Sequence, residues 1–526
     1  MKKVTSTFRH LMHKPADDEF MKLANELVDL YIPDWDFDIQ PDPNAINFIG
    51  ISGGVDSSAL AAVLLCKHPD IDWHLFFSDT GNEPEEVNSI ISVFSEMMGA
   101  RVTIGYPVRG LLESIEVNGY LPSARQRWCT AQLKIKVWED YLSKLLENPE
   151  SVCVNYSGIR FDERDRVGIL GIDRVMSSHP FVNQRVERRA VVKIAQGLEL
   201  LGGSYFRGKS RSGCMNCFFQ AKQELISLAI WDPVQFEKGA KAEKLNDSIL
   251  DVLDDSNHPI EDKGYYCGYP LSNMSIEGKQ SLIIDTLLGE SRSDNSGVNW
   301  NYLFTRKPAP KKKAMNNDAQ TSMFEDVVEA PVEQQEYVDL YVAIEHLIHP
   351  LMRESNLGVY SQLPISYSTT LSGLSRSIGG YMYHRRTLAD AFFNSEKDYE
   401  EQSHVTVLCL RFPRSVLPIV DYNQPGVYTW SSGTSYLEIS HTLRAINRLS
   451  HYLFSLQMIE LSEKHRIDGI TLKESRKFVE TVKCSGVELG QLIGIGHFKP
   501  KQSMQDLRDD SYDENPKTVR CIACSI

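Results

Sequence analysis

The sequence of 526 residues predicts an α/β fold with a parallel sheet, followed by a second, α+β domain. Two observations predict the first part. The apolar run Asn47–Ile51 breaks at a Ser-Gly-Gly turn and resumes as the apolar segment Ala59–Leu65, which is the pattern of a strand, a tight loop and a helix. A second apolar run, Leu75–Ser78, also ends in a short polar turn, as strands of an open parallel sheet do.

The loop after the first strand has the residue types that bind a phosphate group. Consecutive glycines let the backbone adopt positive φ angles and approach a ligand closely. Serine hydroxyls and the free N–H groups of the first helical turn then converge on an anion. The expected phosphate-binding residues are Ser52, Gly53, Gly54, Ser57 and Ser58. A Gly-Gly turn with an ordinary Ser or Asp helix cap is the alternative interpretation.

Asp56 is the acidic member of this loop, and a carboxylate repels a phosphate unless it has another role. We expect Asp56 either to cap the helix or to hold Mg²⁺, which prefers carboxylate and phosphate oxygens. No Gly-Lys-Ser/Thr sequence follows, so the loop is not a Walker loop.

The turn after the second strand is Asp79-Thr80-Gly81. Because the carboxyl ends of neighbouring parallel strands meet at one edge of a sheet, we expect Asp79 and Thr80 to face the same ligand as Ser52. A polar turn without a ligand is the alternative.

Three cationic side chains are candidates for contacts with phosphate or sulfate oxygens. Arg127 and Lys134 lie seven residues apart, hence on one face of a helix, although a solvated basic face gives the same pattern. Arg160 follows the strand-like run Val154–Tyr156, and its guanidinium suits a bidentate phosphate contact that lysine cannot make. Neighbouring charges are expected to pair with one another, namely Asp162, Glu163, Arg164 and Arg166.

The sequence has ten cysteines, and two of them form the Cys-x-x-Cys motif Cys214–Cys217. With no secretory signal and no long apolar run, the chain is expected to be cytoplasmic, without a membrane span and with reduced thiols. A metal site needs two further ligands, for which Cys129 and then Cys267 are the candidates. Four thiolates hold either Zn²⁺ or a [4Fe–4S] cluster, and spacing alone does not separate the two. Packing or turn capping is the alternative role.

Five ordered motifs between Ile46 and Phe219 resemble the PAPS-reductase-like branch of the PP-loop ATP pyrophosphatases, the adenine nucleotide α-hydrolase superfamily. Besides the loop at 52–58 and Asp-Thr-Gly at 79–81, they are Arg-x-Cys-Thr-x-x-Leu-Lys at 127–134, Gly-Ile-Arg-x-Asp-Glu at 158–163 and the Cys-x-x-Cys pair. The resemblance implies a Rossmann-like sheet whose loop binds ATP with Mg²⁺. The cysteines of DNA-phosphorothioation and tRNA-thiolation relatives favour an iron–sulfur cluster.

The implied reaction is attack on the α-phosphorus with release of pyrophosphate, followed by sulfur transfer onto nucleic acid. In this scheme Asp79, Thr80 and Gly81 place the nucleotide, and the implied catalytic residues are Asp56, Arg127, Lys134 and Arg160. A sulfur-donating or complex-forming protein is an expected partner. Two alternatives are an adenylyl-sulfate (PAPS or APS) reductase and a nucleotide sensor in a defence or regulatory complex. The Glu-Cys-Gly-x-His element of assimilatory reductases is absent from the sequence.

The net charge of −14 argues against a protein that coats nucleic acid non-specifically, because counterion release requires a broad positive surface. A local basic cluster precedes the Cys-x-x-Cys motif and could guide a polyanion toward the site. Its members are Arg185, Arg188, Arg189, Arg207, Lys209 and Arg211.

Length and composition predict a nucleotide domain at 1–305, a linker at 306–337 and an α+β domain at 338–526. The linker is rich in Pro, Lys and acidic residues. The second domain is expected to begin with a helix, because apolar residues recur at helical spacing at Leu340, Ile344, Leu347, Ile348 and Leu351. A strand at 404–410 and a helix at 443–459 are also expected. A second Cys-x-x-Cys pair, Cys521 and Cys524, is compatible with a zinc clip completed by Cys484 and His497, and equally with a mobile dithiol that resolves persulfides or with a tail that has no role.

Overall fold

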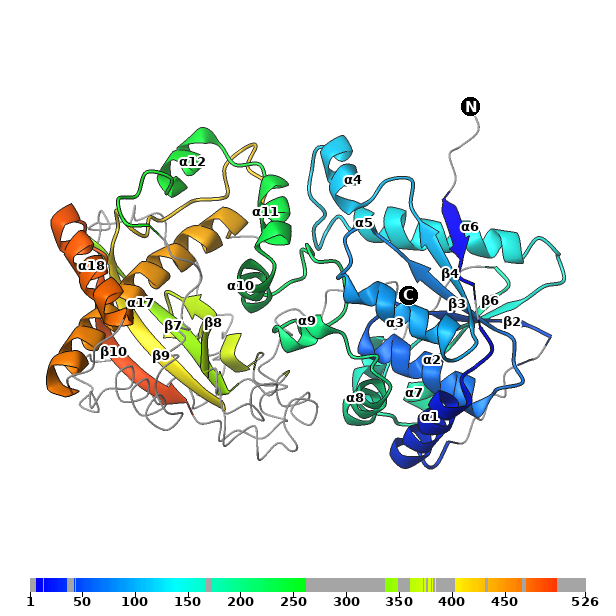
Figure 1. The fold of residues 1–526 in the computed structure, drawn as a ribbon. Coiled ribbons are helices and arrows are strands. Elements are labelled where there is room, and N and C mark those ends of the chain that lie inside the picture. Colours follow the sequence, from blue (N-terminus) through cyan, green and yellow to red (C-terminus); the bar gives the residue numbers. More distant parts are fainter. Residues whose placement is uncertain are drawn as a thin grey trace, which may run out of the picture.

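A computed structural model describes residues 6–261 and 336–498, apart from 13, 36–41, 43, 167–172, 349–359, 372, 375, 376, 380, 382–383, 385–402, 431–433 and 466–469. Within these residues the chain forms two units, each built on its own sheet (Figure 1). None of the helices in the described ranges is both long and apolar enough to cross a membrane.

The first unit contains a six-stranded sheet in the order β1-β4-β3-β2-β5-β6. Every pair is parallel except the edge pair β1–β4, so the α/β prediction is confirmed. The strands are β1 (Thr7–His10), β2 (Ile46–Gly50), β3 (Trp73–Ser78), β4 (Arg101–Tyr106), β5 (Cys153–Tyr156) and β6 (Val175–Ser178).

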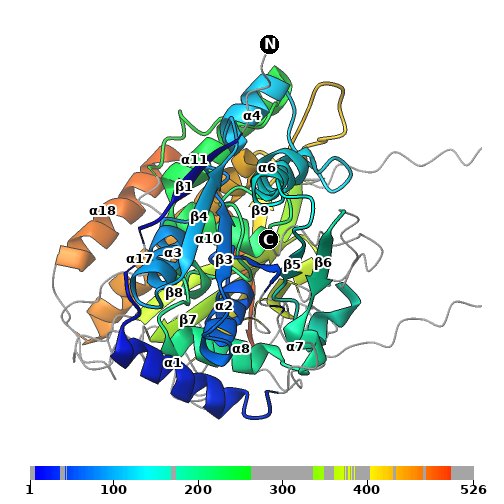
Figure 2. The same ribbon diagram turned by 90° about the vertical axis from the view of Figure 1, so that its right-hand side faces the viewer.

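Helices cover both faces of this sheet, which explains why its central strands are apolar on both sides. In β2, Phe48 packs with α6 (Lys136–Leu145) on one face. The next residue, Ile49, packs with α1 (Asp18–Tyr31), α2 (Val55–Lys67) and their neighbours on the other face. The helices α1, α2 and α8 (Arg188–Gly197) contact one another (Figure 2). Further helices complete the unit, namely α3 (Glu86–Glu96), α4 (Leu111–Asn118), α5 (Trp128–Thr130), α7 (Pro180–Asn183) and α9 (Gly203–Phe206).

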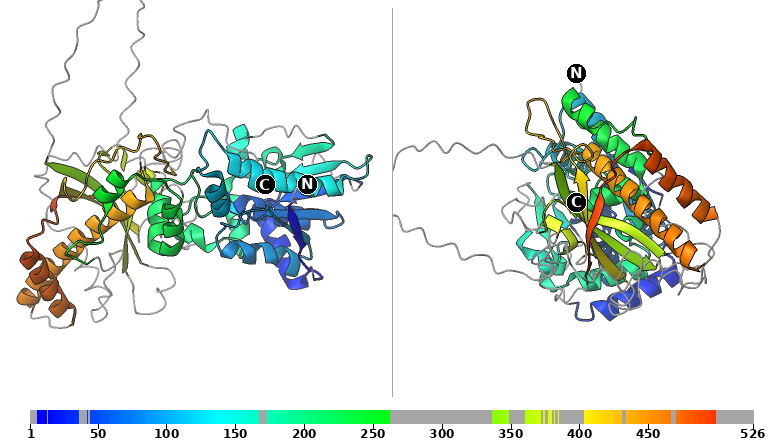
Figure 3. Two further views of the ribbon diagram at one scale, coloured as in Figure 1. Left: turned by 90° about the horizontal axis from the view of Figure 1, so that it is seen from above. Right: turned by 90° about the vertical axis from the view of Figure 1, so that its left-hand side faces the viewer.

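The second unit contains a four-stranded antiparallel sheet in the order β10-β9-β7-β8. Its strands are β7 (Tyr337–Ile348), β8 (Tyr360–Ser368), β9 (Ser403–Pro413) and β10 (Gln491–Phe498). The helices α17 (Tyr436–His465) and α18 (Ile470–Ser485) pack together beside it (Figure 3). The predicted strand at 404–410 and the predicted helix at 443–459 are confirmed as parts of β9 and α17.

The prediction that this unit begins with a helix is wrong, because residues 337–348 form strand β7. Leu340 and Ile344 are four apart, a spacing that fits a helical face but also fits one face of a strand, where alternate residues align. The additional buried residues Val338 and Val342 complete a two-residue period and add β-branched side chains. Leu351 lies outside the described residues.

Residues 222–253, which precede the predicted linker, pack on the second sheet rather than the first. They form α10 (Lys222–Trp231), α11 (Pro233–Lys241) and α12 (Asp247–Leu253). All three contact α17, and α10 also contacts β8. The apolar side chains of α10 and α11 share one core with Trp128 and Leu133 of the first unit, so this core joins the two units. Residues 306–335 of the predicted linker lie outside the described ranges.

The ion pair between Asp255 and Arg448 should stabilise the packing of the residues after α12 against α17. Asp255 follows α12, Arg448 belongs to α17, and their atoms approach to 2.6 and 2.8 Å with side chains only 4% and 7% exposed. Asp255→Asn should lower the free energy of unfolding by about 3–5 kcal/mol, because the substitution leaves a buried guanidinium without its carboxylate. Urea denaturation at neutral pH measures the change.

The exposed pair Lys14–Glu96 provides the control, and Glu96→Gln should change the unfolding free energy by less than about 1 kcal/mol. Burial alone would raise the pKa of Asp255, but the hydrogen bonds from Arg448 hold this pKa below its ordinary value of 3.8. The stabilisation is therefore present above that pH and lost in acid, where the Asp255→Asn protein and the wild type should converge. Equal effects of the two variants at neutral pH would contradict the assignment.

Candidate functional site

The candidate site begins where β2 ends and α2 starts. Gly53 has φ +66°, and a Cβ at this position would lie 2.7 Å from Cγ1 of Val87 in α3. A Cβ on Gly54 would lie 2.1 Å from the hydroxyl of Ser212. Both positions therefore require glycine, the first for its backbone angle and both for the close approach of a neighbour.

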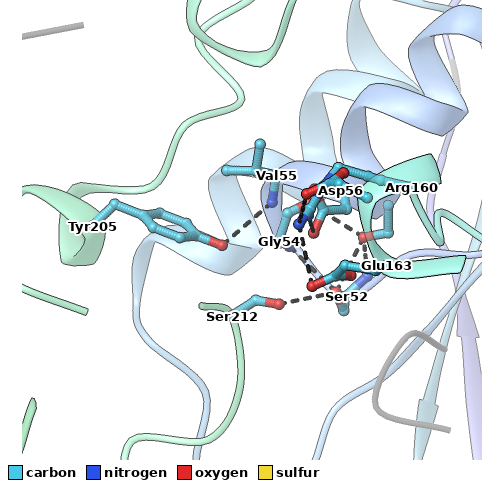
Figure 4. A network of polar contacts seen from close by, with 10 residues as sticks. Ser52, Gly54, Val55, Asp56, Arg160, Glu163, Tyr205 and Ser212 are labelled. Atoms are coloured by element: carbon cyan, nitrogen blue, oxygen red, sulfur yellow. Dashed lines mark hydrogen bonds and ion pairs between the residues drawn. The ribbon is translucent and has the colours of Figure 1, made fainter. Parts of the chain in front are cut away.

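Hydroxyl groups surround this loop (Figure 4). The Ser57 hydroxyl accepts a hydrogen bond from Ser52 N and lies 3.0 Å from the Ser52 hydroxyl. The Ser212 hydroxyl lies 3.4 Å from that of Ser52, and the Tyr205 hydroxyl accepts a hydrogen bond from Val55 N at 3.4 Å. The loop therefore presents hydroxyl and N–H donors to one place, at the N terminus of a 13-residue helix.

Arg160 lies behind the loop and is only 3% exposed. Its guanidinium contacts Asp56 at 2.5 Å, Asp162 at 3.0 Å and Glu163 at 3.1 Å. Burial alone would lower the pKa of Arg160, but the three carboxylates raise it well above its ordinary value, so the group stays charged. Asp162 and Glu163 therefore contact Arg160, and their expected pairing with Arg164 or Arg166 stays a prediction.

Asp56 lies in the first turn of α2 and faces Arg160. The residue at the cap position is Gly54, and no described side chain caps this helix, so the expectation that Asp56 caps it is wrong. The second carboxylate oxygen, Oδ1, is buried without a hydrogen-bond partner among the described residues, and so is the hydroxyl of Ser58. Unsatisfied buried oxygens of this kind suit a ligand or a cation.

Gly158, which follows β5, packs closely against the first turn of this helix. A Cβ there would lie 2.8 Å from the carbonyl oxygen of Asp56 and 3.1 Å from the nitrogen of Ser57. The backbone after β5 therefore lies directly against the first turn of α2, where a larger residue does not fit.

Residues of the second motif, 79–81, contact one another and the segment 214–217 that carries the Cys-x-x-Cys motif, the cysteine loop. Asp79 accepts a hydrogen bond from Gly81 N at 2.8 Å, and burial raises the pKa of this carboxyl group. The Thr80 hydroxyl donates to Glu83 at 2.8 Å and lies 3.2 Å from the Cys214 sulfur. The structure therefore brings Thr80 and the Cys-x-x-Cys motif together.

A buried amide pair strengthens this contact and extends it to the second unit. Asn82 accepts a hydrogen bond from Asn216 N at 2.8 Å and donates to the Asn216 side chain at 3.2 Å. The Asn216 amide in turn donates to Gln235 O at 3.2 Å and to the Tyr436 hydroxyl at 3.4 Å. Because Tyr436 begins α17, one fully buried asparagine links the second motif to the second unit.

Arg127 and Lys134 do not lie on one regular helix. Arg127 precedes the short helix α5, and residues 131–135 form a turn of π-helix, η1, before α6 begins. The Arg127 guanidinium lies 4.8 Å from the centre of the Phe219 ring. Lys134 is close enough to Cys214 to lower the pKa of that thiol. The structure therefore places both cations beside the cysteine loop.

The described residues alone do not form a metal site. Cys129 and Cys214 pack against the same core. No three His, Cys, Asp or Glu side chains within the described ranges are grouped so that they could hold a metal ion. Cys267, Cys521 and Cys524 lie outside those ranges, so both metal sites stay predictions.

The predicted basic cluster does not form one solvated surface. Lys209 is buried, donates to Gly213 O at 2.6 Å, and burial lowers its pKa. Arg211 is exposed and donates to Phe219 O at 2.6 Å. At least one of the six expected cations therefore supports the cysteine loop from inside instead of facing a partner.

Sequence reasoning missed Tyr205, Ser212, Glu83 and Asn216. The last three lie within or beside the motifs, but their contacts span more than 120 residues of sequence. No local pattern indicated Tyr205.

No family model matches the chain, and no curated protein matches it.

Arg160→Gln should destabilise the protein without any ligand, by about 3–5 kcal/mol of unfolding free energy, because it leaves three carboxylates without their buried cation. Arg164→Gln is the control, since Arg164 is exposed and, among the described residues, contacts Phe161 through a 3.3 Å hydrogen bond to its carbonyl oxygen and through its ring. Chemical denaturation of the ligand-free proteins measures both. Unchanged stability of Arg160→Gln would instead indicate a residue reserved for ligand binding.

The Cys214 thiol should react slowly with iodoacetamide near neutral pH. Burial and then the Glu83 carboxylate raise the pKa of this thiol well above its ordinary value, so little thiolate is present. The exposed Cys484 should be alkylated much faster. Glu83→Gln removes one cause of the raised pKa and should speed the alkylation of Cys214 several-fold, as followed by peptide mass spectrometry. Alkylation of Cys214 as fast as that of Cys484 would contradict this account.

Proposed function

We propose that this chain is an ATP-binding PP-loop enzyme of the PAPS-reductase-like type, which acts at the α-phosphate and releases pyrophosphate. The observation that carries the proposal is the position of the Ser52–Ser58 loop at the carboxyl end of β2. The parallel strands follow the order β4-β3-β2-β5-β6, so the chain direction across the sheet reverses between β2 and β5. In open α/β sheets of Rossmann-like type, ligands bind outside the carboxyl ends of the strands at this reversal.

The residues at the reversal support an anionic ligand. The loop offers the Ser52 and Ser57 hydroxyls and the N–H groups of the first turn of α2, whose dipole favours negative charge. Gly158 lets the end of β5 approach the same turn. These donors are suited to hold a polyphosphate and to stabilise charge that develops on its oxygens.

The carboxylates around Arg160 support a role for Mg²⁺. Three carboxylates and one guanidinium leave a formal charge of −2 (three negative, one positive) beside the loop. A phosphate chain would be repelled by this charge without a compensating cation. Asp56 Oδ1, which has no hydrogen-bond partner among the described residues, has the chemistry that Mg²⁺ prefers. When bound, Mg²⁺ would neutralise phosphate charge and polarise the leaving pyrophosphate.

Roles for the remaining side chains follow from their positions. Arg160 orients Asp56 rather than reaching the phosphate chain itself. Asp79 and Thr80, after the neighbouring strand β3, are proposed to place the nucleoside, and Lys134 and Arg127 to attract the acceptor. Cys214 lies 3.2 Å from Thr80, which supports a reaction that couples adenylation to sulfur chemistry on an acceptor such as nucleic acid.

A second candidate function is a nucleotide sensor that controls the second unit. The hydrogen bonds from Asn216 to both Asn82 and Tyr436 favour it, because they connect the nucleotide edge to the start of α17. Tight ATP binding without turnover would support the sensor, whereas pyrophosphate release supports the enzyme.

The wild-type protein should convert ATP to AMP, or to an adenylated acceptor, and pyrophosphate. Gly53→Ala should abolish this activity, because the added Cβ lies 2.7 Å from Val87 at a position with φ +66°. Gly119→Ala is the matched control, since Gly119 also has a positive φ, +77°, but no close neighbour in the site. This variant should lose a similar amount of unfolding free energy, about 1–2 kcal/mol, and retain activity. ATP labelled at the α- and γ-phosphates distinguishes the products.

Release of orthophosphate with ADP would contradict attack at the α-phosphorus. Equal activity of Gly53→Ala and the wild type would show that the loop does not hold the substrate.

A further inference from the structure

The segment after α8 reaches back to the phosphate loop at two points. Tyr205 lies in α9 and is 5% exposed, and its hydroxyl accepts a hydrogen bond from Val55 N. Ser212 follows α9, and its hydroxyl approaches Ser52 from the side where Gly54 has no Cβ. Neither residue belongs to the motif of the loop, and Figure 4 shows both hydroxyls pointing toward it.

The Tyr205 hydroxyl remains a proton donor over the whole physiological range. Burial, and then the charge of Asp56, raise the pKa of this phenol to about 12, although Arg188 opposes the shift. A side-chain hydrogen bond also connects Tyr205 with Ser212. The two hydroxyls therefore form one linked pair of donors next to a helix N terminus.

The contacts of this pair with the loop are long. Both distances are 3.4 Å, above the usual range of about 2.7–3.2 Å for such hydrogen bonds. A backbone N–H in the first turn of a helix interacts more strongly with an anion than with a neutral hydroxyl. A phosphate oxygen that accepts a hydrogen bond from Val55 N would therefore displace the tyrosine oxygen as acceptor. The hydroxyl groups of Tyr205 and Ser212 could then donate hydrogen bonds to the phosphate.

We propose that Tyr205 and Ser212 bind the phosphate chain together with Ser52 and Ser57, so that α9 and the residues after it complete the phosphate site. The ligand class is a diphosphate or triphosphate chain. The identity of that chain as part of ATP rests on the proposed function, whereas binding of an inorganic probe does not. The opposite possibility is that the two hydroxyls fill the site and compete with phosphate, and the sign of the effect separates the two.

Calorimetric titration of the full-length protein with inorganic pyrophosphate and Mg²⁺ tests the proposal. Tyr205→Phe and Ser212→Ala should each weaken binding about tenfold, the effect expected for one lost hydrogen bond to a charged group. Tyr31→Phe on α1 and Ser143→Ala on α6 remove a hydroxyl elsewhere and should leave the affinity unchanged. Thermal unfolding of the ligand-free variants identifies any variant that does not fold. If Tyr205→Phe does not fold, the affinity of Ser212→Ala decides the test.

Unchanged or tighter pyrophosphate binding in both variants would overturn the proposal, and tighter binding would indicate competition with phosphate. Absence of pyrophosphate binding by the wild type would overturn it as well. The proposed function can fail separately. If the wild type binds pyrophosphate and both variants bind it more weakly, but the wild type releases no pyrophosphate from ATP, the phosphate site is supported and the proposed reaction is not. If ATP is cleaved but the variants bind normally, the reaction stands and the role of these hydroxyls does not.

Discussion

The buried ion pairs of Arg160 are the constraint on which the candidate site depends. A guanidinium that is 3% exposed is tolerated because carboxylates from α2 and from residues 162–163 neutralise it. The pairing fixes the first turn of α2 against the end of β5, where Gly158 allows backbone contact. The helix N terminus, the glycine loop and the unpartnered Asp56 oxygen therefore occupy defined positions before any ligand arrives.

The same edge of the sheet is connected to the second unit by polar contacts as well as by a shared core. Asn216 is fully buried and bonds to residues of the second motif, α11 and α17. Buried polar networks of this kind are costly when one partner is lost, so movement on one side is opposed on the other. The helices α10 and α11 add apolar side chains to a core that both units share. The cysteine loop contacts the second motif through Cys214 and Thr80. Through Asn216 it also contacts the second unit, so a movement of either unit can change the surroundings of Cys214.

The sequence predicted the parallel sheet, the phosphate loop and the turn at Asp79 because each depends on local order: an apolar strand, then glycines and hydroxyls, then a helix. It did not predict β7, since residues spaced by four satisfy both a helical and a strand period. It also missed the partners of Arg160, because several carboxylates lie within reach in the sequence and only the fold decides which of them the guanidinium meets. Tyr205 and Ser212 were beyond sequence reasoning for the same reason, as their contacts join residues about 150 positions apart.

Binding of a polyphosphate to the loop at 52–58 can be located by amide hydrogen exchange of the full-length protein with and without ATP and Mg²⁺, because exchange reports the place of binding without requiring turnover. We expect slower exchange in the first turn of α2, with smaller protection after β5 and in the segment 203–212. Protection elsewhere, with exchange at Val55–Ser58 unchanged, would contradict it.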